Sequence, residues 1–272
     1  MTSARRRLGG AAAAVCMGLA LGACASGQDA EAEALGSTGS LAEGSSTTSP
    51  ADPGGPGGPG EGREVPASCA ALTLAPGSVL DGTGLGDCVS QALASFGSGT
   101  MQAIGDPYGE VDFTYDPDYS FRGEFTGPDG PISLTFVDGV MWVDTGSGPV
   151  KGDTESADPE EQMAGVAAAL YRVFSDPAQT ASLVAAQPNW TVQQARDQVS
   201  LPDGSTVESF KIVSDGPFVW NEIPVAEYIL WYGDDWVPVG SQASMTVMGQ
   251  SAINSQKYYD LGAPITIAPP AR

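Results

Sequence analysis

Residues 132–143 give the first structural signal; they are Ile132-Ser133-Leu134-Thr135-Phe136-Val137-Asp138-Gly139-Val140-Met141-Trp142-Val143. Apolar and polar side chains alternate from Ile132 to Phe136, as on a strand with one buried face. Asp138-Gly139 is a typical hairpin turn, so 140–143 is predicted to return as the neighbouring strand. This segment predicts antiparallel β-structure.

The same period of two recurs on both sides of this hairpin. Strands are predicted at residues 111–115, 119–125, 192–201, 206–213, 225–232, 237–248 and 252–259, the second of them weakened by Gly123. Turn signals such as Asp203-Gly204 and Asp215-Gly216 separate several of these strands. We therefore expect a largely antiparallel meander.

Helices are predicted to interrupt the meander. Asp158-Pro159 starts one helix, and Asp176-Pro177 starts a shorter one that ends near residue 187. A third helix is expected at residues 88–96. The glycine-rich residues 82–86 resemble a phosphate-binding loop, but the last glycine of that motif is missing and no predicted strand precedes them, so they are interpreted as a turn. This order predicts an α+β fold, with the helices packed on one face of a long antiparallel sheet.

The N-terminus has the layout of a secretory leader. Arg5–Arg7 precede an apolar run of 16 residues, 8–23, which is shorter than the roughly 20 that span a bilayer. Leu21-Gly22-Ala23 before Cys24 resembles a bacterial lipobox, which implies that residues 1–23 are removed and that Cys24 is lipidated. An ordinary signal peptide or an anchor helix is the alternative. The lipobox predicts a protein held at the extracytoplasmic face of the cell membrane.

Composition divides the rest of the chain in two. Residues 24–64 are mostly Ala, Gly, Ser, Thr, Pro, Asp and Glu, and they are predicted to be a disordered acidic tether. A Gly-rich tether of about 40 residues has an r.m.s. reach of roughly 35 Å. Residues 65–272 are predicted to form a single globular domain, since this length suffices for one substantial core.

Charge and the missing histidine exclude several function classes. Removal of the leader leaves 8 basic and 33 acidic residues, a net charge of −25, which opposes nucleic-acid binding. The chain has no histidine, so it lacks a Ser-His-Asp or Cys-His apparatus and histidine metal sites. We therefore predict no catalytic residues, no metal and no cofactor; glycoside hydrolysis by paired carboxylates is the residual enzymatic alternative.

Cys69 and Cys88 are the two cysteines that follow Cys24. In an oxidising compartment such a pair is most simply a disulfide. Their spacing is not C-x-x-C, and no histidine exists to complete a metal site. We predict a structural bridge between them.

Several motifs in the second half of the chain resemble one family. Residues 228–239, with Trp231, Asp234-Asp235 and Val237-Pro238, resemble its hairpin of a Trp-containing strand, an acidic turn and a Leu-Pro return. Residues 258–270 are similar to its closing segment. Residues 136–143 and Ser175-Asp176-Pro177 resemble its central hairpin and helical insert. The family is that of the LppX/LprG-type mycobacterial lipoproteins, related in fold to the LolA carriers. The resemblance covers about residues 97–270 and leaves the cysteine pair and the tether unexplained.

This resemblance implies a curved, half-open antiparallel sheet whose concave face is covered by helices. The space between them would be a cavity for a lipid, glycolipid or acylated ligand, carried between membrane sites without a cofactor. The candidate cavity residues are Phe113, Tyr115, Leu134, Phe136, Val166, Leu170, Phe174, Tyr228 and Leu230. An apolar stripe looks the same when it fills a packed core, so a non-carrier lipoprotein that serves as a protein-interaction or sensory module is the alternative function.

Overall fold

One long antiparallel sheet organises this computed structural model, which describes residues 63–105, 108–115, 118–127, 130–166, 176–247 and 250–271. The described residues belong to one compact unit, Asp52–Arg272. The leader and Cys24 lie outside the described residues. None of the helices in the described part of the chain is long and apolar enough to cross a bilayer.

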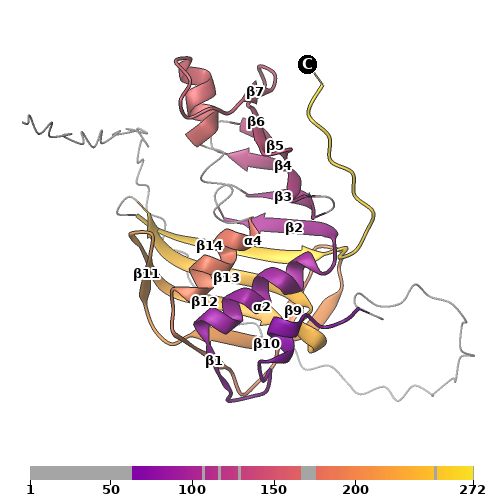
Figure 1. Cartoon of the computed structure of the whole chain (residues 1–272), viewed down its shortest axis with the longest axis vertical. Coiled ribbons are helices and arrows are strands. Elements are labelled where there is room, and N and C mark those ends of the chain that lie inside the picture. The colour runs from indigo at the N-terminus through magenta and orange to yellow at the C-terminus, as the bar shows by residue number, and fades with distance from the viewer. Residues whose placement is uncertain are drawn as a thin grey trace, which may run out of the picture. The chain divides into compact units, whose positions relative to one another are not determined.

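The strands of the first half are β1 (Val79–Asp81), β2 (Ser98–Ile104), β3 (Tyr108–Thr114), β4 (Ser120–Gly127), β5 (Gly130–Val137), β6 (Val140–Asp144) and β7 (Val150–Lys151). Those of the second half are β8 (Asn189–Val192), β9 (Asp197–Ser200), β10 (Thr206–Ser214), β11 (Phe218–Trp220), β12 (Ile223–Tyr232), β13 (Pro238–Val247) and β14 (Gln250–Tyr259). Their main path is β1-β8-β10-β12-β13-β14-β2-β3-β4-β5-β6-β7, with β9 on β10 and β11 on β12 (Figure 1).

The pairing of β14 with β2 joins the two halves of the chain into one sheet. The predicted hairpin at 132–143 is present as β5 and β6. The strand predicted at 192–201 is wrong, because the chain leaves β8 at Val192 and starts the separate strand β9 at Asp197. In that gap the Arg196 guanidinium lies over the Phe210 ring, 3.8 Å from its centroid, and bonds to Asp234.

Gly123 does not interrupt β4, in contrast to the sequence-based expectation. A Cβ there would lie 2.6 Å from the ring of Phe125 and 3.0 Å from Val111. The glycine therefore leaves room for the Phe125 ring to lie along the sheet, and the strand continues through it.

The helices are α1 (Ala67–Ala70), α2 (Gly82–Ala94) and α4 (Pro177–Ala185), and residues 159–166 are also helical. The start signals read from the sequence act as expected: the Asp176 carboxylate accepts a hydrogen bond from Ala178 N, and Asp158 accepts one from Glu160 N. A short 3₁₀ turn, η1 (Asp234–Trp236), joins β12 to β13.

The interpretation of residues 82–86 as a turn is wrong, because they form the first turns of α2. β1 precedes them, and the Asp81 carboxylate caps the helix by accepting a hydrogen bond from Gly84 N at 2.8 Å. Gly82 and Gly86 face α4 so closely that a Cβ would lie 1.8 Å from the Gln187 carbonyl oxygen and 2.5 Å from that of Ala181. These glycines therefore serve helix packing rather than a turn.

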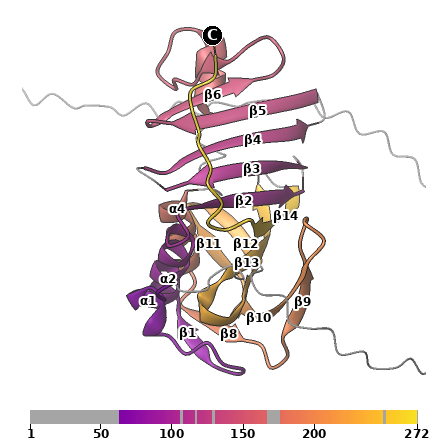
Figure 2. The same cartoon turned by 90° about the vertical axis from the view of Figure 1, so that its right-hand side faces the viewer.

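The α2–α4 pair covers one face of the sheet over β10, β12 and β13 (Figures 1 and 2). Leu85 and Val89 of α2 and Val184 of α4 pack there with strand residues such as Ile212 and Leu230. The predicted fold class is confirmed: it is α+β, a large open antiparallel sheet with a few helices.

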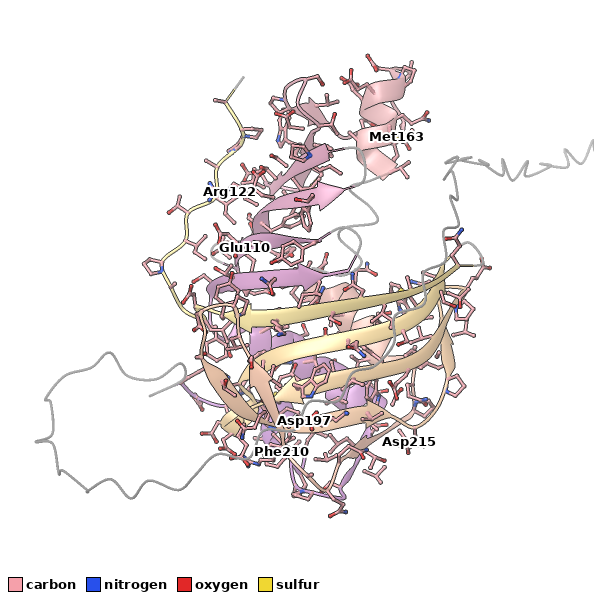
Figure 3. The ribbon with its side chains drawn as sticks, turned by 180° about the vertical axis from the view of Figure 1, so that it is seen from behind. Glu110, Arg122, Met163, Asp197, Phe210 and Asp215 are labelled. Carbon is pink, nitrogen blue, oxygen red and sulfur yellow. A yellow bond between two sulfur atoms is a disulfide. The ribbon has the colours of Figure 1, made fainter. Side chains whose placement is uncertain are left out.

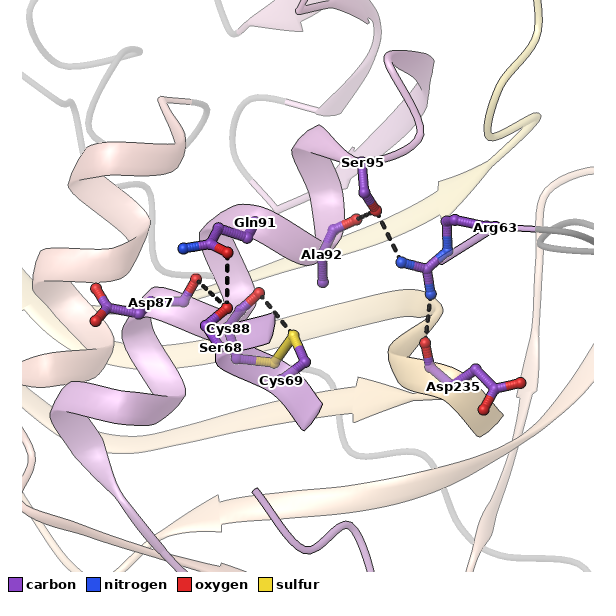
Figure 4. Close-up of a disulfide and its surroundings, with 9 residues drawn as sticks. All are labelled: Arg63, Ser68, Cys69, Asp87, Cys88, Gln91, Ala92, Ser95 and Asp235. Atoms are coloured by element: carbon purple, nitrogen blue, oxygen red, sulfur yellow. Dashed lines mark hydrogen bonds between the residues drawn. A yellow bond between two sulfur atoms is a disulfide. The ribbon is translucent and has the colours of Figure 1, made fainter. Parts of the chain in front are cut away.

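Cys69 and Cys88 form the predicted disulfide, which links α1 to α2 (Figure 4). Both cysteines are fully buried. The bridge therefore fixes α1, and with it the chain that precedes β1, to α2.

The chain after β14 runs across β2–β6 (Figure 2). Gly262 N donates to Ser98 O, and Ser98 Oγ donates to Ala263 O. Polar side chains such as Asp112 and Arg122, which form an ion pair at 3.1 Å, lie on the face of the sheet opposite to the Phe113 side chain. Figure 3 shows this part of the sheet from behind, with Glu110 and Arg122 labelled.

Candidate functional site

The helix side of the sheet carries an almost continuous apolar surface. Residues directly opposite each other in an antiparallel pair lie on the same face. One row of such partners passes through Leu230, Ser241, Gln256, Ala103, Gly109, Phe125 and Ile132. The row starts beneath the helix pair and continues beyond it, so both halves of the sheet share this face.

Two clusters of buried side chains lie on this face. The covered cluster lies beneath α2 and α4 and includes Leu85, Val184, Ile212, Tyr228 and Leu230. The aromatic cluster lies on β2–β6; it consists of Met101, Ala103, Val111, Phe113, Phe121, Phe125, Leu134, Phe136, Met141, Val143 and Ala164. The sheet thus presents two apolar regions where the sequence suggested one cavity.

The structure divides the candidate cavity residues between these clusters. Phe113, Leu134 and Phe136 belong to the aromatic cluster, and Tyr115 packs against it. Tyr228 and Leu230 belong to the covered cluster. The alternation in the sequence therefore identified the correct face of each strand.

Val166 departs from this pattern. The Val166 side chain is 43% exposed, and that of Met163, one turn earlier, is 52% exposed. A Cβ on Gly165 would lie 2.6 Å from Thr154 N. The helix therefore approaches the loop after β7 closely at Gly165, while Ala164 packs in the aromatic cluster. Leu170 and Phe174 lie outside the described residues.

The space between the helix pair and the sheet is nearly filled. A void of about 20 Å³ is lined by residues that include Leu93, Thr180, Tyr228, Tyr258 and Leu230. A second void of about 10 Å³ lies beside it and shares Thr180, Tyr228 and Ser241. An acyl chain does not fit into either void, so this part of the interface must widen to admit one.

The lining of this interface is unusually rich in tyrosine. Burial raises the pKa of Tyr228 to about 12, and it also raises the pKa values of Tyr232 and Tyr258. The Tyr258 hydroxyl bonds to Gln256 Oε1 at 2.9 Å, and its ring lies edge-on to Phe113. The tyrosines stay protonated, so they add polar hydroxyl groups to the interface without adding charge.

Tyr115 differs from these tyrosines. Its hydroxyl oxygen is buried, and among the described residues it has no hydrogen-bond partner. Burial raises the pKa of Tyr115 well above its ordinary value, with further contributions from Tyr119, Tyr258 and Asp176. The hydroxyl is therefore protonated and available as a donor.

An open groove of about 750 Å³ lies at the end of the interface. It is bordered by the β9–β10 hairpin, the turn after β12 and the end of β14, and it shares Tyr258 and Pro238 with the 20 Å³ void. Its rim carries five carboxylates, those of Asp203, Glu208, Asp234, Asp235 and Asp260. Tyr258 and Pro238 thus separate the open groove from the interior.

Arg63 borders this groove and fixes the start of the described chain. Its guanidinium donates to Ser95 Oγ at 2.8 Å and to the Asp235 carbonyl oxygen (Figure 4). It also lies over the Phe96 ring. Asp235 and Trp236 both have positive φ, at 52° and 58°, and the Trp236 side chain is buried. The residues that would follow the predicted tether are therefore held at the mouth of the groove.

The groove, the tyrosine lining and the Tyr115 hydroxyl, which has no hydrogen-bond partner among the described residues, were not predicted from the sequence. The groove is built from three turns that are distant in the sequence, which no local pattern brings together. Tyr228, Tyr232 and Tyr258 are visible in the sequence, but the sequence does not distinguish a buried hydroxyl from one at the surface. Within the described residues, no group of three His, Cys, Asp or Glu side chains could hold a metal ion.

No family model matches the chain, and no curated protein matches its sequence. The structure is similar to that of LprF from Mycobacterium bovis, with 14% identity, a TM-score of 0.41 and coverage of 70% of this chain and 97% of that one. A DUF1329 family protein from Desulfovibrio piger matches with 9% identity, a TM-score of 0.28 and coverage of 69% and 96%. A LolA superfamily protein from Nitrosomonas europaea matches with 8% identity, a TM-score of 0.26 and coverage of 66% and 92%.

Proposed function

We propose that this chain is an extracytoplasmic lipoprotein, anchored through Cys24, that binds or carries a lipid or another acylated hydrophobic ligand. The observation that carries the proposal is the apolar face described above. It continues from the covered cluster to the aromatic cluster across the β14–β2 pairing. The lipobox and the family resemblance of the sequence support the same function.

The chemistry of such a carrier is partition between two apolar environments. Each buried CH₂ group contributes about 0.8 kcal/mol, so the protein must offer nearly the same burial as the bilayer for both loading and release. The aromatic cluster provides apolar contact area, and the polar residues around the small voids weaken the contact between α4 and the sheet. A mixed interface of this kind separates at lower cost than a fully apolar one.

Native mass spectrometry of the full chain, purified without detergent, tests the proposal. We expect acyl species to co-purify with the protein. Ala103→Trp would place a large ring on the apolar face and should displace the ligand, because Ala103 belongs to the aromatic cluster. Gln102→Trp is the matched control, since adjacent strand residues point to opposite faces.

Far-UV circular dichroism establishes that both variants are folded. If the unsubstituted protein carries no acyl species, the carrier function is wrong. If Ala103→Trp retains the ligand as well as Gln102→Trp does, the ligand lies elsewhere.

One observation favours the alternative function, an interaction module. The voids beneath α2 and α4 total only tens of Å³, whereas the open groove has about 750 Å³ and an acidic rim. A groove of this size and charge suits a basic protein segment. Crosslinking at Glu208 on living cells would capture such a partner, and an absence of ligand together with a captured basic partner would favour this alternative.

A further inference from the structure

The Tyr115 hydroxyl is the feature of the apolar face that packing alone does not explain. The backbone N–H of Tyr115 donates to Gly97 O at 2.7 Å, but its hydroxyl oxygen is buried without a hydrogen-bond partner among the described residues. A buried polar group without a partner normally destabilises a protein, and such groups are rare in native structures. Phenylalanine would fill the same space without this cost.

Among the described residues, the neighbours of the Tyr115 ring include other aromatic rings. The Tyr115 ring stacks on Tyr119 at 5.3 Å and lies edge-on to Phe113 at 5.7 Å. Asp176, which caps α4, is a charged side chain of the described part of the chain whose electrostatic influence reaches Tyr115. A negative ligand group would be repelled there, whereas an uncharged acceptor would not.

The position of Tyr115 is also suited to a ligand. It follows directly after β3, against the aromatic cluster, while Tyr258 and Leu93 of the same neighbourhood line the void beneath the helices. A ligand that spans both clusters would therefore pass the Tyr115 hydroxyl.

We propose that the Tyr115 hydroxyl donates a hydrogen bond to an uncharged acceptor oxygen, such as an ester carbonyl, within an otherwise apolar ligand. This inference rests on the proposed function and specifies the ligand: an acyl ester rather than a pure hydrocarbon or a free fatty acid. Tyr115 determines specificity, since the bond is made only when the ligand brings the acceptor into the apolar site.

The test compares Tyr115→Phe with the unsubstituted chain, both carrying Cys24→Ala so that the full chain is purified without lipid anchor or detergent. The probes are methyl decanoate, decanoate and dodecane, each competing with the fluorescent dye N-phenyl-1-naphthylamine. We expect the affinity ratio of methyl decanoate to dodecane to fall about five- to tenfold in Tyr115→Phe, the loss of one hydrogen bond. Decanoate should bind more weakly than methyl decanoate to the unsubstituted chain.

Thermal unfolding of the unliganded proteins gives a second, independent readout. Tyr115→Phe should unfold at the same temperature or at a higher one, because it removes a buried hydroxyl that none of the described residues bonds. Tyr259→Phe is the matched control: the Tyr259 hydroxyl bonds to Glu110 on the other face, so this variant should lose stability and keep the ester preference.

The outcomes separate the two proposals. An unchanged ester-to-alkane ratio in Tyr115→Phe, or a lower unfolding temperature, overturns the role of Tyr115 and leaves the carrier function standing. If the unsubstituted chain binds none of the probes, the proposed function fails, and the inference about Tyr115 fails with it.

Discussion

At Gly86 the backbones of two helices come into direct contact. A Cβ on Gly86 would lie only 2.5 Å from the Ala181 carbonyl oxygen, and Gly82 approaches Gln187 even more closely one turn earlier. Glycine has a cost in a helix, about 1 kcal/mol relative to alanine. The close approach of α2 and α4 explains why glycine is nevertheless present at both positions.

Gly86→Ala is therefore expected to destabilise the protein by about 1–3 kcal/mol, since the helices must separate to admit the methyl group. Gly84→Ala on the same helix is the matched control. Its Cβ would meet only ordinary contacts at 3.5 Å, so helix propensity should make it neutral or stabilising. Urea denaturation measures both variants, and equal effects would contradict the packing role of Gly86.

The buried tyrosines predict alkaline sensitivity. An unfolded tyrosine ionises near pH 10, whereas burial raises the pKa of Tyr228 to about 12. The contribution of Tyr228 to stability is fully present below pH 10 and falls as the pH rises toward 12, by on the order of 1.4 kcal/mol per pH unit. Tyr228→Phe should flatten this decline in urea denaturation between pH 10 and 11.5; an unchanged slope would contradict the prediction.

At the scale of elements, the disulfide makes a fixed unit of α1 and α2. Cys69 and Cys88 are 19 residues apart, and closing such a loop contributes on the order of 3 kcal/mol by restricting the unfolded chain. The Cys69→Ala, Cys88→Ala double variant should lose about this much free energy of unfolding. Added dithiothreitol should lower the stability of the unsubstituted protein and leave that of the double variant unchanged; equal sensitivity would refute a structural bridge.

Strands with clear alternation could be predicted from the sequence, and irregular ones could not. β5, β6, β10, β12, β13 and β14 follow their patterns closely. β2 was missed because Ser98–Ile104 mixes small and polar residues; its place between β14 and β3 is determined by tertiary pairing. The start of α2 was missed because glycines in that segment serve contact with α4, which only the folded structure supplies.

For the candidate site, the sequence predicted which face of the sheet is apolar, but not whether a cavity lies above that face. Alternation placed Phe113, Leu134 and Phe136 together, because a period of two determines which side of a strand is buried. It did not give the volume between helices and sheet, since packed and open interfaces have the same apolar pattern. The exposure of Val166 and the close approach of Gly165 to the loop after β7 have no signature in the apolar periodicity.

At the scale of the whole molecule, the lipid anchor remains a prediction, since Cys24 lies outside the described residues. Cys24→Ala should release the protein into the medium or leave its leader uncleaved, because the thiol is the expected site of acylation. Cys16→Ala is the matched control, as this residue would leave with the leader. Membrane fractionation and the mass of the mature protein test this, and a processed Cys24→Ala variant that stays membrane-bound would exclude the anchor.

The strand order ends in very short strands, β1 with three residues and β7 with two. A sheet edge of this length presents only a few unpaired N–H and C=O groups to a neighbouring molecule. Neighbouring copies of the protein would find little backbone with which to join edge to edge, and their shared negative charge would keep them apart. The short end strands therefore oppose the growth of this large sheet into fibrils.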